Sequence, residues 1–167
     1  MKMKQVFKPR RSTGWIWVAV IGLVLLAVGL GLFFSTGTSG PLQITILPTC
    51  IIGLGFLAIA IFFPSMRYEI GDTCLSLTYG PMLRYSINYE EIKSIHRRDL
   101  GFGAISSFRF PGLALFKVPY PEVGTVNMCA TASGDDILLI ETSSAKYGIT
   151  PADEEAFVAE LRKHIAK

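Results

Sequence analysis

Residues 12–66 read STGWIWVAVIGLVLLAVGLGLFFSTGTSGPLQITILPTCIIGLGFLAIAIFFPSM, and none of these 55 residues is Asp, Glu, Lys or Arg. Charged residues make up 17% of the chain, against about a quarter of an average soluble protein. Uncharged apolar runs of this length are typical of membrane-spanning segments. The run excludes an ordinary soluble domain over these residues and predicts a membrane protein.

Two stretches of this run are each long enough to cross a bilayer as an α-helix. They cover residues 14–34 and 41–63, and the small polar residues STGTSG at 35–40 separate them. At about 1.5 Å per residue, a helix over 14–34 covers a hydrocarbon core of about 30 Å. A connection this short makes the helices antiparallel neighbours. The sequence therefore predicts a transmembrane helical hairpin over 14–63.

Small residues within both predicted helices allow the two backbones to approach closely. They are Gly22, Ala27, Gly29 and Gly31 in the first helix, and Gly53, Gly55, Ala58 and Ala60 in the second. Pro48 lies near the start of the second helix, where it is expected to bend or weaken the first turns.

The flanking charges predict the orientation of the hairpin. The tail at 1–13 carries five basic residues and no acidic one, Arg67 follows the second helix, and the connection at 35–40 is uncharged. The positive-inside rule then places both chain ends in the cytoplasm. The five bases either only set this topology or also bind anionic lipid, at about 1 kcal/mol each near the membrane surface. They are Lys2, Lys4, Lys8, Arg10 and Arg11.

A cleaved signal peptide is the alternative interpretation of residues 1–34, since a basic start leads into an apolar stretch. The stretch at 14–34 is longer than a usual signal-peptide core of about 7–15 residues, and no A-x-A cleavage site follows it. An uncleaved anchor is therefore favoured.

Residues 64–167 have the composition and patterning of a small β-rich domain. Frequent Gly, Pro, Ser and Asp turns separate short runs that alternate apolar and polar residues, as in CLSLTY at 74–79 and LRYSINY at 83–89. A period of two indicates half-buried strands. DILLIET at 136–142 is apolar on both faces and is expected to be the most buried strand.

An amphipathic helix is expected to end the domain. Thr150, Pro151 and Asp153 are a helix-start pattern, with Thr150 as the N-cap. The following apolar stripe contains Phe157, Val158, Leu161 and Ile165. About seven strands followed by one helix predict an α+β membrane protein in which the hairpin precedes a pleckstrin-homology-like (PH-like) β-barrel, capped by the C-terminal α-helix.

The chain resembles bacterial membrane proteins that carry a PH-like domain behind one or two spanning helices. The resemblance lies in PSMRYEIGDTCLSLTYG at 64–80, GAISSFRFPGLALFKV at 103–118, GTVNMCATASGDDILLIET at 124–142 and YGITPADEEAFVAELRKHI at 147–165. It implies a two-span protein of the bacterial cytoplasmic membrane without the catalytic residues of an enzyme. Eukaryotic relatives bind phosphoinositides through several basic residues in the turn between their first two strands. Here the corresponding turn at 79–84 contains one basic residue, Arg84.

One basic cluster in the predicted domain is a candidate interaction site for an anionic lipid, a peptide or a protein. It consists of His96, Arg97, Arg98 and Arg109. The alternative is a solvated strand end balanced by Asp99, Glu90 and Glu91, since surface charges contribute little. The aromatic residues crowded into 101–121 form either barrel core or an exposed patch that touches the bilayer or another subunit.

The motifs of common enzyme and cofactor sites are absent from the sequence. It has no G-x-S-x-G, HExxH, Walker or dinucleotide glycine loop, and its three cysteines form no CxxC pair. Residues 67–167 carry 11 basic and 13 acidic residues, so the domain is not basic and nucleic acid is not an expected partner. No catalytic residue, metal or cofactor is expected.

The sequence therefore predicts a non-enzymatic, membrane-anchored PH-like domain protein. We expect it to mediate protein or peptide interaction or assembly at the cytoplasmic face of the membrane, with a protein partner or a second copy of the chain. Recognition of anionic lipid at the membrane surface is the alternative, and an enzyme with an unrecognised site is a third class.

Overall fold

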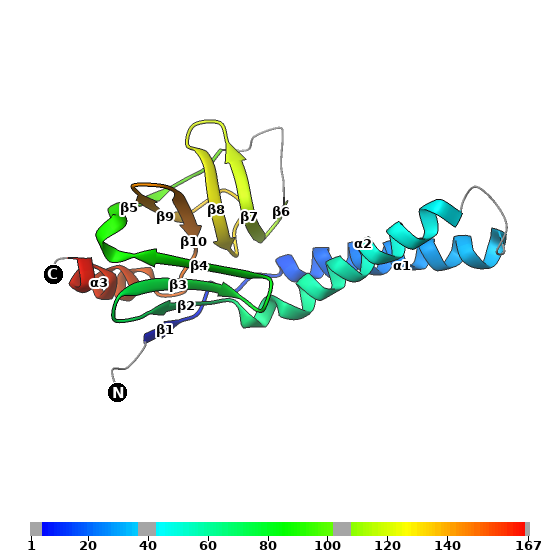
Figure 1. Cartoon of the computed structure of the whole chain (residues 1–167), viewed down its shortest axis with the longest axis horizontal. Coiled ribbons are helices and arrows are strands. Elements are labelled where there is room, and N and C mark those ends of the chain that lie inside the picture. Colours follow the sequence, from blue (N-terminus) through cyan, green and yellow to red (C-terminus); the bar gives the residue numbers. More distant parts are fainter. Residues whose placement is uncertain (1–4, 37–42, 102–107, 166–167) are drawn as a thin grey trace. The chain divides into compact units, whose positions relative to one another are not determined.

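The computed structural model describes residues 5–36, 43–101 and 108–165 (Figure 1). Contacts between residues divide the chain into two compact units. One unit, called the domain below, contains residues 1–14 together with 65–167, and the other contains the helices at 15–64. The domain is therefore assembled from chain on both sides of the helices.

The helical unit contains the two predicted apolar helices, α1 (Gly14–Thr36) and α2 (Gln43–Phe62), and a 3₁₀ turn η1 (Phe63–Ser65) follows. Both helices are long and apolar enough to cross a membrane. Pro48 lies inside α2 as its sixth residue, beyond the first turn in which a proline is tolerated without loss of a helix hydrogen bond.

Close approach of α1 and α2 occurs at some of the predicted glycines. A Cβ atom on Gly22 would lie 2.9 Å from the Gly53 carbonyl oxygen, and one on Gly53 would lie 3.0 Å from the Gly22 oxygen. Gly29 similarly faces the Cys50 sulfur. A Cβ atom on Gly31 or Gly55 would meet none of the described residues within 4 Å, so the prediction is confirmed at three glycines and wrong at these two.

The domain has two sheets and one helix, all labelled in Figure 1. The antiparallel four-stranded sheet has the order β1 (Gln5–Phe7), β2 (Arg67–Ile70), β3 (Cys74–Tyr79) and β4 (Leu83–Asn88). The 3₁₀ turn η2 (Tyr89–Glu91) leads to the other sheet. The six-stranded sheet has the order β5 (Ile92–Arg98), β9 (Ile137–Thr142), β10 (Lys146–Ile149), β8 (Gly124–Ala130), β7 (Leu113–Tyr120) and β6 (Arg109–Phe110). The helix α3 (Glu154–Ile165) follows β10.

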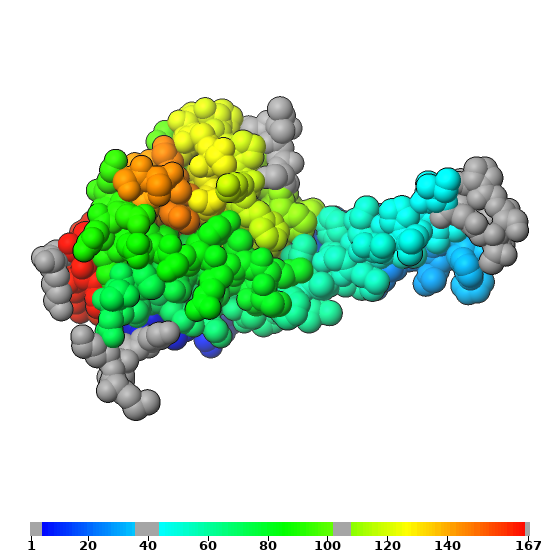
Figure 2. Space-filling model, in the orientation of Figure 1, coloured from blue at the N-terminus to red at the C-terminus, as the bar shows by residue number. Residues whose placement is uncertain are grey.

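The predicted closed barrel of about seven strands is wrong. Among the described residues, β4 pairs only with β3 and β5 pairs only with β9, so the sheets stay open between these consecutive strands. The turn η2 separates them and directs β5 into the other sheet. The sheets still meet through side chains: the rings of Tyr85 in β4 and Tyr147 in β10 lie 5.5 Å apart. Figure 2 shows the green and orange surfaces of these segments in contact.

Strand β1 lies within residues 1–13, which were predicted to be a basic tail outside the folded domain. Phe7 pairs with Tyr68 and Gln5 with Ile70, so β1 is the antiparallel edge strand beside β2. The next residues are also fixed: the Ala152 amide donates to the Lys8 carbonyl at 2.9 Å, and the Arg10 amide to the Thr150 carbonyl at 2.7 Å. Residues 5–10 thus belong to the folded domain.

The core confirms most of the predicted burial. Leu75, Leu77 and Tyr79 are fully buried, as are Phe157 and Leu161 of α3. The four residues of 137–140 are all buried, which confirms the burial on both faces that was expected for this strand.

The predicted N-cap at Thr150 is wrong. The Asp153 carboxylate accepts from the Ala156 amide at 3.0 Å, directly before α3 begins at Glu154. The buried Thr150 hydroxyl instead accepts from the Thr131 amide at 2.8 Å. Thr150, directly after β10, thus uses its hydroxyl to satisfy a backbone amide next to β8. The exposed Asp153 is the residue that caps the helix.

Candidate functional site

A cleft of about 490 Å³ opens between the β2–β3 turn, η2 and the end of α3. The turn contributes Asp72, η2 contributes Tyr89 and Glu90, and α3 contributes His164. The full lining is Asp72, Thr73, Asn88, Tyr89, Glu90, Glu91, His164 and Ile165.

Two stacked rings form one wall of the cleft. The Tyr89 and His164 rings lie 5.1 Å apart with an interplanar angle of 27°. The Tyr89 hydroxyl donates to the Gly71 carbonyl at 2.6 Å, which fixes its ring against the β2–β3 turn. Burial raises the pKa of Tyr89 to about 12, so the hydroxyl keeps its proton at neutral pH.

Acidic groups dominate the polar part of the lining, in which Asp72 and Glu90 are exposed. The Asn88 side-chain amide donates to the Glu91 carboxylate at 2.8 Å and holds it in place. Carboxylates beside an aromatic face attract a cation through charge and through the ring quadrupole. The arrangement suits a lysine or arginine side chain of a partner. Within the described ranges no three His, Cys, Asp or Glu residues form a possible metal site.

Residues 66–165 match the family model described as bacterial PH domain. The chain belongs to the bacterial PH domain family. No curated protein and no solved structure matches the chain. Family membership confirms the resemblance seen in the sequence, and it supports a general binding or anchoring role.

The four residues predicted as a basic cluster do not lie together in this bacterial PH domain, and two of them are paired with acidic residues. The Arg97 guanidinium lies 2.6 Å from the Asp136 carboxylate, and that of Arg98 lies 3.2 Å from Glu122. His96 lies on the same strand, with its Nδ1 3.5 Å from the Ser94 hydroxyl. Arg109 lies on β6, the other outer strand of the sheet, where its guanidinium is 5.1 Å from the centre of the Tyr120 ring.

The N-terminal bases lie partly in the PH domain and partly outside the described residues, as Lys2 and Lys4 do. Arg10 forms ion pairs with Asp136 at 3.4 Å and with Glu154 at 3.8 Å. Lys8 and Arg11 are exposed. The guanidinium of Arg10 therefore has acidic partners within the domain.

Sequence reasoning missed the acidic cleft of this PH domain. Asp72 lies in a turn that the sequence indicates, and His164 lies in the last turn of the predicted helix. The turn η2, which contains Glu90 and Glu91, was not predicted. The missing information was that α3 packs its C-terminal turn against η2. The stacking of His164 on Tyr89 depends on that packing, and no local pattern signals it.

Proposed function

We propose that this protein is a two-span protein of the bacterial cytoplasmic membrane that holds a non-enzymatic PH domain at the cytoplasmic face, where the domain binds a protein or peptide partner. The pairing of β1 with β2 carries the proposal. These strands flank the helical hairpin in the chain, and one sheet cannot be shared across a bilayer. Insertion of the hairpin therefore leaves both flanks on the same side of the membrane.

The surface of α1 and α2 supports insertion. Apolar side chains are exposed along both helices: Trp17 is 56% exposed, Leu23 58% and Ile61 72%. A contiguous apolar surface of this kind needs a nonpolar surrounding. The basic residues before α1 and Arg67 after α2 favour the cytoplasm as the side that holds the domain.

Cysteine accessibility tests the anchoring. The background is Cys50→Ala, Cys74→Ser and Cys129→Ala, and the single reporters are Ser39→Cys in the connection and Ser144→Cys in the exposed β9–β10 turn. In intact cells, a membrane-impermeant maleimide is expected to label Ser39→Cys, and to label Ser144→Cys only after permeabilisation. Labelling of Ser144→Cys in intact cells, or release of the protein by an alkaline carbonate wash, contradicts the proposal.

The acidic cleft favours a basic segment as the partner. A decalysine peptide titrated into the full chain in nanodiscs of zwitterionic lipid is expected to bind more tightly than decaglutamate. The double variant Asp72→Lys with Glu90→Lys should weaken decalysine binding at least tenfold, whereas Glu155→Lys, at an exposed acid of α3 outside the cleft, should leave it nearly unchanged. Equal binding by all three proteins contradicts a role for the cleft.

Recognition of anionic lipid through the predicted bases receives less support from the structure. Arg10, Arg97 and Arg98 each have an acidic partner in the domain. Binding of phosphatidylglycerol headgroups through these residues would have to compete with the existing ion pairs.

A further inference from the structure

The β6–β7 turn is held against the residue at which α1 begins. The Ser12 hydroxyl donates to the Gly112 carbonyl at 2.6 Å, and the Gly14 amide donates to the Ser12 hydroxyl at 3.1 Å. Gly112 has a φ of 78°, and its Cβ position would be occupied by the Ser12 hydroxyl. The turn therefore lies directly beside the point where the chain leaves the domain.

The β3–β4 turn lies beside the point where the chain re-enters the domain. Ser65 and Arg67, which follow α2, line one small cleft together with Gly80 and Arg84 from either side of this turn. Both exits of the domain are thus flanked by a tight turn. If the helices span the bilayer, as proposed above, the headgroup region begins at these two places.

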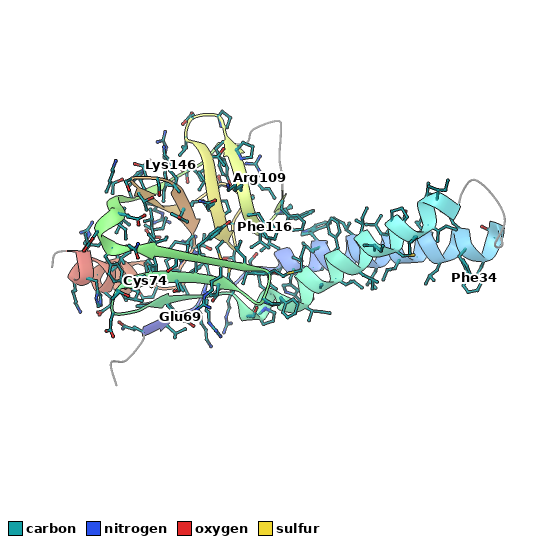
Figure 3. All side chains as sticks on the ribbon, in the orientation of Figure 1. Phe34, Glu69, Cys74, Arg109, Phe116 and Lys146 are labelled. Carbon is teal, nitrogen blue, oxygen red and sulfur yellow. The ribbon has the colours of Figure 1, made fainter. Side chains whose placement is uncertain are left out.

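The β6–β7 turn carries a cluster of aromatic rings. The Phe108 ring lies 5.1 Å from that of Phe110 and 5.8 Å from that of Phe116, in edge-to-face geometry. All three rings are half-buried, and Pro111 at the tip of the turn is exposed. Figure 3 labels Phe116 on β7.

The backbone of Phe116 has an unusual conformation that places its ring in this cluster. Its φ of 64° is rare for a bulky residue. The pairing of β7 with β8 stays in register through Phe116. Ala114 and Val118, the alternate residues on either side, are fully buried, whereas the Phe116 ring is half-buried. Backbone strain of this kind is often kept at functional positions.

The geometry points to a surface of the domain that lies in the interface of the same bilayer. This interfacial surface consists of Phe108, Phe110, Pro111 and Phe116 beside the exit to α1, with Met82 beside the entry from α2. The inference rests on the proposed function, because it requires α1 and α2 to span the membrane.

The composition of the interfacial surface matches the lipid interface. Aromatic side chains prefer the headgroup level, and Trp15 and Trp17 follow Gly14 immediately in the chain. Each headgroup region is several ångströms deep, so a turn bonded to the first residue of a spanning helix lies within it. Arg84 is exposed beside the β3–β4 turn, where its guanidinium group can reach lipid phosphates, whereas the exposed Arg67 is paired with Glu69 at 2.7 Å.

Fluorescent probes on the two turns test the inference. In the cysteine-free background described above, Pro111→Cys and Met82→Cys are labelled with NBD in the full chain in nanodiscs of phosphatidylethanolamine and phosphatidylglycerol. The control is Ser144→Cys, which the strand registers place at the opposite end of the six-stranded sheet from the β6–β7 turn. Lipids with a nitroxide near the headgroup should quench both turn probes several-fold more strongly than the control.

Quenching of both turn probes no stronger than that of Ser144→Cys overturns the inference, provided that the protein resists an alkaline carbonate wash. Release by that wash instead overturns the proposed function. If Pro111→Cys fails to fold by thermal unfolding, the result for Met82→Cys decides, since this exposed side chain lies on a separate turn.

Discussion

Phe7 packs edge-to-face against Phe157, with ring centroids 5.2 Å apart and planes at 85°. Phe7 precedes the helical hairpin in the chain and Phe157 belongs to the last helix. Phe157 also contacts the Tyr68 ring, 6.2 Å away, in the first strand after the hairpin. This contact joins three segments that are far apart in sequence, and it places the start of the chain in the same core as its end.

Replacing Phe7 and Phe157 one at a time should show how much each ring contributes to the stability of the domain. Phe157→Ala is expected to lower the free energy of unfolding of the domain by about 3–5 kcal/mol, because the ring is fully buried. Phe7→Ala removes a half-buried ring on an edge strand and should lower it by about 1 kcal/mol. Pulse proteolysis of the full chain in detergent measures both values, and equal losses would contradict the packing described.

The contact between the β6–β7 turn and Ser12 makes Gly112 more sensitive than a matched glycine. Gly112 and Gly124 have φ of 78° and 79°, but among residues 5–36, 43–101 and 108–165 nothing lies within 4 Å of a Cβ atom on Gly124. Gly124→Ala is expected to cost about 1–2 kcal/mol for the left-handed backbone conformation. Gly112→Ala should cost clearly more in the same unfolding assay, because its methyl group displaces the Ser12 hydroxyl. Adding Ser12→Ala should recover part of the loss, whereas equal costs at the two glycines would refute the contact.

The glycines of α1 and α2 should differ in how much they contribute to the packing of the two helices, because only some of them face the other helix. Gly22→Val or Gly53→Val should destabilise the pairing of α1 with α2 by on the order of 1–3 kcal/mol, because the side chain meets the facing backbone. Gly31→Val and Gly55→Val are the controls, since a Cβ atom at either position meets no atom of the described part of the chain within 4 Å. The measurement is unfolding by SDS titration, followed by energy transfer between the ends of the helices. Four equal effects would show that the helices do not approach at Gly22 and Gly53.

The Arg97–Asp136 ion pair should make stability depend on pH in the acid range. The Arg97 guanidinium holds the pKa of the Asp136 carboxyl below its usual value. A pKa lowered by folding adds stability above the unfolded-state pKa, near 4, and that stability is lost as pH falls through the folded-state pKa. Asp136→Asn should therefore lower Tm at pH 5–8, and its difference from the natural protein should shrink below about pH 4.

Asparagine is a suitable replacement at position 136 because Asp136 has a φ of 56°, which asparagine tolerates. Asp135→Asn, at the exposed neighbouring acid, is the control and should leave Tm nearly unchanged across the same range. A Tm difference for Asp136→Asn that persists unchanged at pH 3 would show that the ion pair is not its source.

Much of the fold could be predicted because its signals are local. The uncharged run marks both helices, the period of two in 74–79 marks β3, and the stripe containing Phe157 and Leu161 marks α3. Strand β1 is different. Its three residues are too few for a periodic pattern, and it is stable only because Phe7 finds Phe157 and because β2 offers a free edge. The open sheets likewise depend on how η2 turns the chain, which no propensity indicates.

The candidate site was less predictable than the fold. His96, Arg97 and Arg98 are adjacent in sequence, but Asp136 and Glu122 come from distant turns to pair with the two arginines. The acidic cleft shows the opposite case, in which Asp72, Glu90 and His164 are scattered in sequence and come together through the docking of α3. Residues adjacent in sequence thus led to the prediction of a basic cluster that the structure does not form, while the residues of the acidic cleft lie too far apart in sequence to be recognised as one site.

Since β1 and β2 are adjacent antiparallel strands, the helical unit is the loop of a long β-hairpin. Cutting the chain at residue 64 would thus remove an edge strand and expose the faces of Phe157 and Tyr68 that Phe7 and its strand cover. A water-soluble version should instead keep residues 1–14 and replace 15–64 with a short flexible linker. During synthesis, β1 therefore leaves the ribosome before α1 and α2, and it can pair with β2 only after both helices have been made.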